Sequence, residues 1–256
     1  MASDAKPIIA WDNKVAGATI TAATEATGFP VENTQDWRAY LRWEGTGSAE
    51  AWIKIDAGVG NTFTATCLGF AGHNLNTIGA TNVVLQYSNN DAAWTNCHTP
   101  FTPSDDTAQF VAFSTQTHRY FRLLIPTGYS APPEIGIWFV GIYTQFEEYP
   151  LPGFDPDGRK IVAENAINQE GYLLGIAKKY IQRELPMPMG ELGRTWVETN
   201  LEPMIDTHFP KPVFLVWDIT NHPEDVFVVR SRDDRIRMPI RANMRRVDFT
   251  WIGVAE

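Results

Sequence analysis

Apolar and polar residues alternate with a period of two along much of the first 143 positions. In the segment 51–56, the apolar residues Ala51, Ile53 and Ile55 alternate with Trp52, Lys54 and Asp56. Successive side chains of a β-strand point to opposite faces, so this pattern predicts half-buried strands. The same interpretation applies to four more segments: 81–88, 109–113, 119–125 and 135–143. Short strands separated by Gly-, Asn-, Pro- and Thr-containing turns predict a β-sandwich or a barrel.

The alternation stops between Glu147 and Gly158. This segment contains three prolines and two glycines. Each proline lacks a backbone donor and restricts the residue before it, so a strand ladder is not expected here. The pattern predicts a domain at 1–146, a linker at 147–158 and a second domain at 159–256.

The second half returns to strand-like patterns around one helix. We expect a helix over 201–209, capped by Asn200, with Pro203 in its first turn and Pro210 after its end. A turn is expected at 186–190. Strands are expected at 172–177, 179–181, 194–198, 213–218, 226–230 and 245–252. The predicted fold is therefore all-β, with a smaller, mostly β C-terminal domain that contains one short helix.

The composition is that of a folded protein rich in aromatic residues. Hydrophobic residues make up 44% of the 256 positions, and there are 9 Trp, 14 Phe and 8 Tyr. The net charge of −9 argues against nucleic acid as a partner, because such proteins need a positive surface. Seven arginines nevertheless lie in the segment 230–246. This cluster is either a set of solvated strand faces or a basic rim that docks an acidic neighbour.

Cys67 and Cys97 define no disulfide framework and no metal-ligand spacing. Pairing across strands is one interpretation of these cysteines, and free thiols in a reducing compartment are the favoured one. The first residues lack the apolar run of a signal peptide, and the apolar stretches are too short to span a bilayer. We therefore expect a soluble chain that is made in a cytosol and is not inserted in a membrane.

Five segments, in a fixed order, carry a family resemblance. The strand 52–58 ends in Asp-Ala-Gly, the hairpin 85–94 contains Tyr-Ser and ends in Trp, and the strand 118–123 reads His-Arg-Tyr-Phe-Arg-Leu. The opening segment, which includes Phe29, Trp37 and Trp43, and the closing Pro-Glu-Ile at 133–135 complete the order. Over residues 8–146 this resembles the discoidin, or coagulation factor 5/8 type C, family. The resemblance implies a galactose-binding-type jelly-roll β-sandwich.

A narrower resemblance concerns the turn 68–75, which contains Ala-Gly-His-Asn-Leu, and the segments 211–218 and 223–226. These are similar to discoidin-like proteins encoded by tailed bacteriophages. The pairing implies a structural component of a phage tail or baseplate, located in the virion and assembled in the host cytoplasm. It also implies a homo-oligomeric ring formed through the C-terminal domain, with other tail proteins as partners and an outward discoidin-like domain that binds host surface glycans.

Sugar binding needs an aromatic face for the pyranose C–H surface and planar polar groups for the hydroxyls. The candidate ligand-binding residues are Trp37, Arg38, Arg42, His73 and Asn74. For His73 and Asn74 a structural role in the turn is the favoured alternative. Three further tryptophans are interpreted as core or hairpin-packing residues: Trp43, Trp52 and Trp94.

No catalytic template occurs in the sequence, so no enzyme activity, catalytic residue, metal or cofactor is predicted. A stand-alone carbohydrate-binding protein and, more remotely, a glycan-degrading enzyme are the alternatives to the tail component. In a ring, burial of Trp and Arg contributes most to subunit contacts. The candidate assembly interface is Arg235, Arg237, Arg241, Arg245, Phe249 and Trp251.

Overall fold

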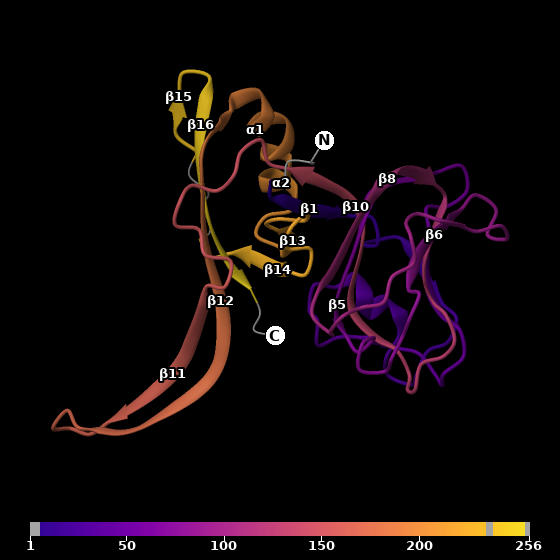
Figure 1. Ribbon diagram of the computed structural model, residues 1–256, viewed down its shortest axis with the longest axis horizontal. Helices are drawn as coiled ribbons and strands as arrows, with labels where there is room; N and C mark the ends of the chain where they lie inside the picture. The colour runs from indigo at the N-terminus through magenta and orange to yellow at the C-terminus, as the bar shows by residue number, and fades with distance from the viewer. Residues whose placement is uncertain (1–5, 234–237, 254–256) are drawn as a thin grey trace. The chain divides into compact units, whose positions relative to one another are not determined.

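The computed structural model describes residues 6–233 and 238–253 (Figure 1). The chain divides into two compact units. The first consists of Ile9–Thr144, and the second contains residues 6–8 and the chain from Gln145 onward. No strand forms between residues 146 and 158, in the segment where the sequence pattern stops.

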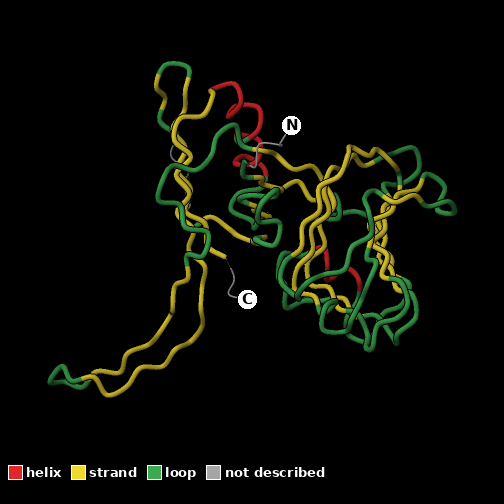
Figure 2. The backbone as a smooth tube through the Cα atoms, viewed as in Figure 1, coloured by secondary structure: helices red, strands yellow, loops and turns green. Residues whose placement is uncertain are grey.

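Two antiparallel sheets form the unit Ile9–Thr144 (Figure 2). In the first sheet the order is β1-β10-β5-β8, with β3 paired to β10. Its strands are β1 (Ile8–Asn13), β3 (Trp43–Glu44), β5 (Phe63–His73), β8 (Gln109–His118) and β10 (Glu134–Gln145). In the second sheet the order is β2-β4-β9-β6-β7. Its strands are β2 (Thr19–Ala22), β4 (Ala51–Asp56), β6 (Val84–Ser88), β7 (Thr95–Asn96) and β9 (Tyr120–Ile125). A 3₁₀ turn, η1 (Val31–Gln35), lies in the connection between β2 and β3.

The core of this unit is built from side chains that alternate along both sheets. In β4, Ala51, Ile53 and Ile55 are buried, as the sequence predicts, while the intervening residues are half-buried. They join one hydrophobic cluster with large aromatic side chains such as Trp43 and Trp138. Burying each such side chain contributes roughly 1.5–3 kcal/mol, so this interior is the main source of stability. The prediction of a two-layer β-sandwich is confirmed.

The second unit is also mostly β. Its strand order is β11-β12-β16-β14-β13, with β15 paired to β16. The strands are β11 (Arg159–Ile167), β12 (Leu173–Gly193), β13 (Val213–Val216), β14 (Val226–Ser231), β15 (Ile240–Arg241) and β16 (Met244–Gly253). The long strand β12 pairs with β11 up to Arg183 and with β16 from Arg183 onward.

The turn predicted at 186–190 is wrong, because this segment lies inside β12. Leu185, Met187 and Met189 are buried, whereas Pro186 is exposed and Pro188 is half-buried. The prolines therefore occupy outward positions of a period-two pattern. Beyond Arg183, β12 pairs with β16 along one edge, and β11 no longer pairs with it along the other edge. A strand tolerates proline where no ladder partner needs its missing N–H.

The strand predicted at 194–198 is also wrong. Residues 194–200 form helix α1 (Arg194–Asn200), and α2 (Glu202–Thr207) follows directly. The buried residues Val197, Leu201 and Met204 have helical spacing, so the helical pattern begins earlier than expected. The side chain of Asn200 donates to the Trp196 carbonyl oxygen at 2.9 Å and is not an N-cap. Pro203 lies in the first turn of α2, as predicted.

Candidate functional site

The loop 36–42 lies against the outer face of the first sheet of the sandwich. Its residue Ala39 packs against Gly72 of β5 and Gly136 of β10. A β-carbon on Gly136 would overlap the Ala39 carbonyl oxygen, so the close approach requires glycine. The Trp37 ring lies 6.2 Å from the ring of Phe139, which is fully buried. The loop is therefore held by packing on both sides of Arg38.

Arg38 and its neighbours form an exposed polar and aromatic group. The guanidinium of Arg38 donates two hydrogen bonds to the Asp36 carboxylate, at 2.9 and 2.7 Å. These bonds hold the pKa of Asp36 below its usual value, so both groups are charged at neutral pH. The Tyr40 ring is 72% exposed, and its centroid is 6.0 Å from the Arg38 guanidinium carbon. Fixed donors, acceptors and an open aromatic ring thus occur together.

Arg42 belongs to a second, less exposed group. Its guanidinium carbon lies 4.7 Å from the Phe29 ring centroid, and its Nε is 3.0 Å from the Glu134 carboxylate. The carboxylate of Glu44 is 3.7 Å from another nitrogen of the same guanidinium. Because two carboxylates already neutralise Arg42, its main role in the structure is to hold the loop beside β3 and β10.

His73 and Asn74 make hydrogen bonds to the backbone. The Leu75 amide donates to His73 Nδ1 at 3.2 Å, so Nε2 carries the proton and donates to the Thr107 carbonyl oxygen at 2.8 Å. Burial lowers the pKa of His73. The Asn74 side chain donates to the Pro132 carbonyl oxygen at 3.0 Å and accepts from the Glu134 amide at 2.9 Å. This geometry favours the structural interpretation of both residues.

The five ligand-binding candidates from the sequence lie in one region of the sandwich. Asn74 and Arg42 both contact Glu134, and Ala39 packs against Gly72, next to His73. Among the candidates, Arg38 is exposed, Trp37 and Arg42 are half-buried, and His73 is buried. Tyr40 and Asp36 were missed by sequence reasoning. The available signal was the loop's own alternation, in which Trp37 and Ala39 pack inward and Arg38 and Tyr40 point outward.

Trp52 and Trp94, interpreted from the sequence as core or hairpin-packing residues, are not part of the buried core. Both rings are half-buried and serve as cation–π partners on the second sheet. Lys54 Nζ lies 5.2 Å from the Trp52 ring centroid, and the Arg122 guanidinium carbon lies 4.2 Å from that of Trp94. Trp43, by contrast, is fully buried, as expected.

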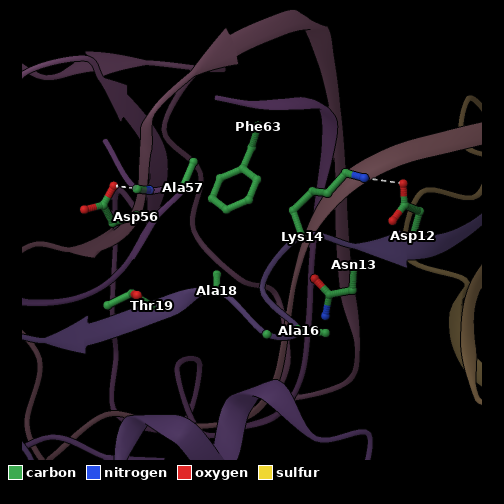
Figure 3. Close-up of a pocket in the computed structure, with 11 residues that line it drawn as sticks. Asp12, Asn13, Lys14, Ala16, Ala18, Thr19, Asp56, Ala57 and Phe63 are labelled. Atoms are coloured by element: carbon green, nitrogen blue, oxygen red, sulfur yellow. Dashed lines mark hydrogen bonds and ion pairs between the residues drawn. The ribbon is translucent and has the colours of Figure 1, made fainter. Parts of the chain in front are cut away.

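A polar hollow of about 420 Å³ opens in the same unit, beside Asn13 and Gly58 (Figure 3). The Phe63 ring lies between the Lys14 side chain and Ala57, and Lys14 pairs with Asp12. The Asn13 side chain donates to the Trp138 carbonyl oxygen at 2.9 Å and accepts from the amides of Val15 and Val140. The charged residues that line this hollow are the Lys14–Asp12 pair and Asp56, whose carboxylate is paired with Arg119.

The assembly candidates of the second unit have internal partners wherever the structure describes their side chains. Phe249 and Trp251 are buried and stack on each other with ring centroids 4.8 Å apart. Arg245 lies 3.3 Å from the Glu202 carboxylate and 3.6 Å from that of Glu198. Phe249 and Trp251 therefore belong to the interior of this unit and not to its surface, whereas Arg245 is half-buried and its assignment to an assembly interface stays a prediction. Arg235, Arg237 and the Arg241 side chain lie outside the described residues.

Within residues 6–233 and 238–253, no group of three or more His, Cys, Asp or Glu side chains is arranged to hold a metal ion. Both cysteines are free and buried. No helix in this described part of the chain has the length and apolar composition needed to cross a bilayer.

Residues 19–139 match the model of the F5/8 type C domain. The chain contains a discoidin-like domain. The F5/8 type C segment spans both sheets of the sandwich, from β2 to β10. No curated protein matches the chain.

Three solved structures are similar to the discoidin-like domain. One is chitosan-binding module 1 of a chitosanase/glucanase from Paenibacillus sp. IK-5, at 21% identity, with 50% of this chain and 97% of that chain covered and a TM-score of 0.42. Another is CBM32 of AlyQ in complex with 4,5-unsaturated mannuronic acid, at 20% identity, 51% and 96% coverage and a TM-score of 0.41. The third is a pectin-binding carbohydrate-binding module, at 17% identity, 48% and 88% coverage and a TM-score of 0.40.

Proposed function

We propose that the discoidin-like domain is a non-catalytic glycan-binding module and that its sugar site is the exposed surface of the loop 36–42. The observation that carries this proposal is the open Tyr40 ring beside the Arg38–Asp36 pair. An aromatic face packs against pyranose C–H groups. The charged pair supplies donors and acceptors to hydroxyl groups.

The fixed position of the loop supports the same proposal. Ala39 is pressed against Gly72 and Gly136, and Trp37 packs near Phe139. A sugar therefore meets groups that are already ordered, and little conformational entropy is lost on binding. The family resemblance of the sequence implies a galactose-binding-type sandwich, and the match of residues 19–139 to the F5/8 type C domain agrees with that family.

The test is a glycan array screen with the full chain, followed by calorimetry on the best ligand. We expect Tyr40→Ala and Arg38→Ala to weaken binding by about five- to tenfold each, because an aromatic–sugar contact contributes roughly 1 kcal/mol. Tyr149→Ala is the matched control, since Tyr149 is a 49% exposed tyrosine of the other unit. If Lys14→Ala abolishes binding and Tyr40→Ala does not, the hollow of Figure 3 is the site instead. Absence of any glycan ligand at millimolar concentration contradicts the proposal.

We also propose that the whole chain is a structural component of a phage tail or baseplate, with the second unit as its assembly module and other tail proteins as its partners. One observation favours this second role. Among the described residues, fourteen large apolar side chains are exposed, and seven of them lie between Ile161 and Tyr180 in the β11–β12 hairpin. Exposed apolar surface of this density marks interaction sites.

Immunogold labelling of purified tail particles with an antibody against this chain tests the assembly role. We expect labels at a fixed position on the tail. Particles that contain no trace of the chain by labelling and by mass spectrometry contradict it.

A further inference from the structure

The β11–β12 hairpin, residues 159–183, is an arm whose outer part has no other strand beside it. In the described chain β11 is the edge strand, and β12 begins to pair with β16 only at Arg183 (Figure 1). A two-stranded hairpin without a packed face is marginally stable in water. The outer arm therefore needs a partner to cover it.

The base of the arm is held by ion pairs. The Glu184 carboxylate lies 2.7 Å from Lys160 Nζ and 2.6 Å from an Arg232 nitrogen. These two bonds lower the pKa of Glu184, so the carboxylate stays charged well below neutral pH. Asp157 lies 2.7 Å from an Arg159 nitrogen and 3.5 Å from one of Arg183. The basic residues at the base are thus neutralised within the chain.

The pairing register gives the arm one apolar face. Residues directly opposite each other across an antiparallel pair share a face, as do alternate residues along a strand. Ile161 is opposite Ile181, Asn165 is opposite Ile176, and Ile167 is opposite Leu173, with irregularities at Lys179 and Leu174. This largely apolar face of the arm, called its apolar face below, therefore carries Ile161, Ile167, Leu173, Ile176 and Ile181, together with Ala163, Asn165 and Lys178. The other face carries Glu164, Ala166 and Tyr180 among its residues.

The outer arm carries no net charge, in contrast to the chain as a whole. Residues 161–181 contain two glutamates and two lysines, whereas the chain has a net charge of −9. Lys179 Nζ lies 2.6 Å from the Glu164 carboxylate, so part of this charge is also paired. Two copies of the outer arm can approach each other without the repulsion that two acidic bodies experience.

We propose that the apolar face of the arm packs against the same face of the arm of a second copy of this chain. This inference rests on the assembly role proposed above and names its partner. The two ribbons form a small two-layer sandwich in which each apolar face covers the other, and an isologous contact of this kind closes by a two-fold axis. The nine residues of β11 make each face roughly 30 Å by 10 Å, or about 600 Å² for two copies. A standard stable interface buries about 1,200–2,000 Å², so the self-association is weak and reversible.

Sedimentation velocity of the full chain from about 1 to about 200 μM tests the proposal, because mass action makes a weak dimer concentration-dependent. We expect the sedimentation coefficient of the wild type to rise with concentration. Ile167→Glu places a charge on the apolar face and should weaken association at least about tenfold. Ala166→Glu is the matched control, because it adds the same charge at the adjacent exposed position on the opposite face and should behave as wild type.

Circular dichroism of both variants establishes that they fold, which is expected because both positions are exposed. A wild type that is monomeric throughout overturns the proposal, as does equal loss of association in both variants. Flotation with phosphatidylcholine–phosphatidylglycerol vesicles addresses a lipid partner. If the wild type is monomeric in solution but binds vesicles, and Ile167→Glu abolishes this binding, the proposal is overturned and the partner of the arm is a membrane surface. Ile167→Glu should leave glycan binding unchanged, and Tyr40→Ala should still weaken it in the Ile167→Glu background. Failure of the arm proposal and failure of the sugar-site proposal are therefore separate results. Particle labelling tests the tail role independently of both.

Discussion

The carbonyl oxygen of Ala39 occupies the space that a β-carbon on Gly136 would need. This single contact ties the exposed loop 36–42 to β10 in the middle of the sandwich. Trp37 and Arg38 are thereby set on opposite sides of the loop, one packed inward and one exposed. The geometry of the proposed sugar site therefore depends on a backbone contact and not only on its own side chains.

Gly136→Ala should displace the loop and weaken the proposed sugar site. Inserting a methyl group into a close-packed contact typically costs about 1–3 kcal/mol, and we expect a loss of this size in the free energy of unfolding. Urea unfolding followed by circular dichroism measures the loss, and calorimetry measures the accompanying loss of glycan affinity. Gly175→Ala is the control, because a β-carbon at Gly175 meets open space. An unchanged affinity in Gly136→Ala would show that the loop position does not matter for binding.

The sandwich was predictable from the sequence because its strands are half-buried. In β4 the buried residues Ala51, Ile53 and Ile55 follow the period of two without interruption. The same logic failed at Pro186, where proline was taken as a turn signal. A strand tolerates proline where no neighbouring strand needs its missing N–H. At Pro186 this holds because β11 does not extend that far, and the extent of β11 is a feature of the tertiary structure that the local sequence does not reveal.

The candidate site was predictable only in part. The sequence pointed to the segment around Arg38 because planar polar and aromatic residues gather there. It did not identify Tyr40, because the exposure of a loop residue is decided by what the loop packs against. It also assigned Trp251 to a surface, since a half-buried strand pattern does not say which face meets the interior of its own unit.

His73 should make the stability of the sandwich depend on pH. Burial lowers the pKa of His73 in the folded state below the value of about 6.5 of an unfolded histidine. The unfolded chain therefore binds the proton more readily, and the free energy of unfolding should fall as the pH drops below about 6.5. The slope from one such group is at most about 1.4 kcal/mol per pH unit.

The variant His73→Gln isolates this effect, because a glutamine side chain also has one donor and one acceptor group for Thr107 and Leu75. Urea unfolding between pH 5 and pH 8 should show a flatter profile for His73→Gln than for the wild type. Burial also lowers the pKa values of His98 and His118, and these two histidines contribute to the slope that remains in the variant. Identical profiles for the two proteins would contradict a buried neutral His73.

Cys67 and Cys97 should resist thiol reagents in the folded protein. Cys67 is fully buried, and burial raises its pKa well above the usual value. Burial also raises the pKa of Cys97 to about 12. Because the thiolate is the reactive form, little reactive sulfur exists at pH 8. A colorimetric assay with an aromatic disulfide reagent should detect no rapidly reacting thiol in the native protein and two reactive thiols in denaturant. Two thiols that react at once without denaturant would place these residues at the surface.

Trp251→Ala distinguishes a core role for this residue from a role in subunit contacts. The side chain is 1% exposed and stacks on Phe249, which itself lies 6.0 Å from Phe146. Removing a buried Trp typically costs about 3–5 kcal/mol, so the second unit should unfold at clearly lower urea concentration. Ile161→Ala removes a side chain that is 62% exposed on the arm, and it should change the free energy of unfolding by less than about 0.5 kcal/mol. Far-UV circular dichroism follows both variants. If Trp251→Ala left the stability unchanged but weakened self-association, Trp251 would have to be assigned to a subunit interface.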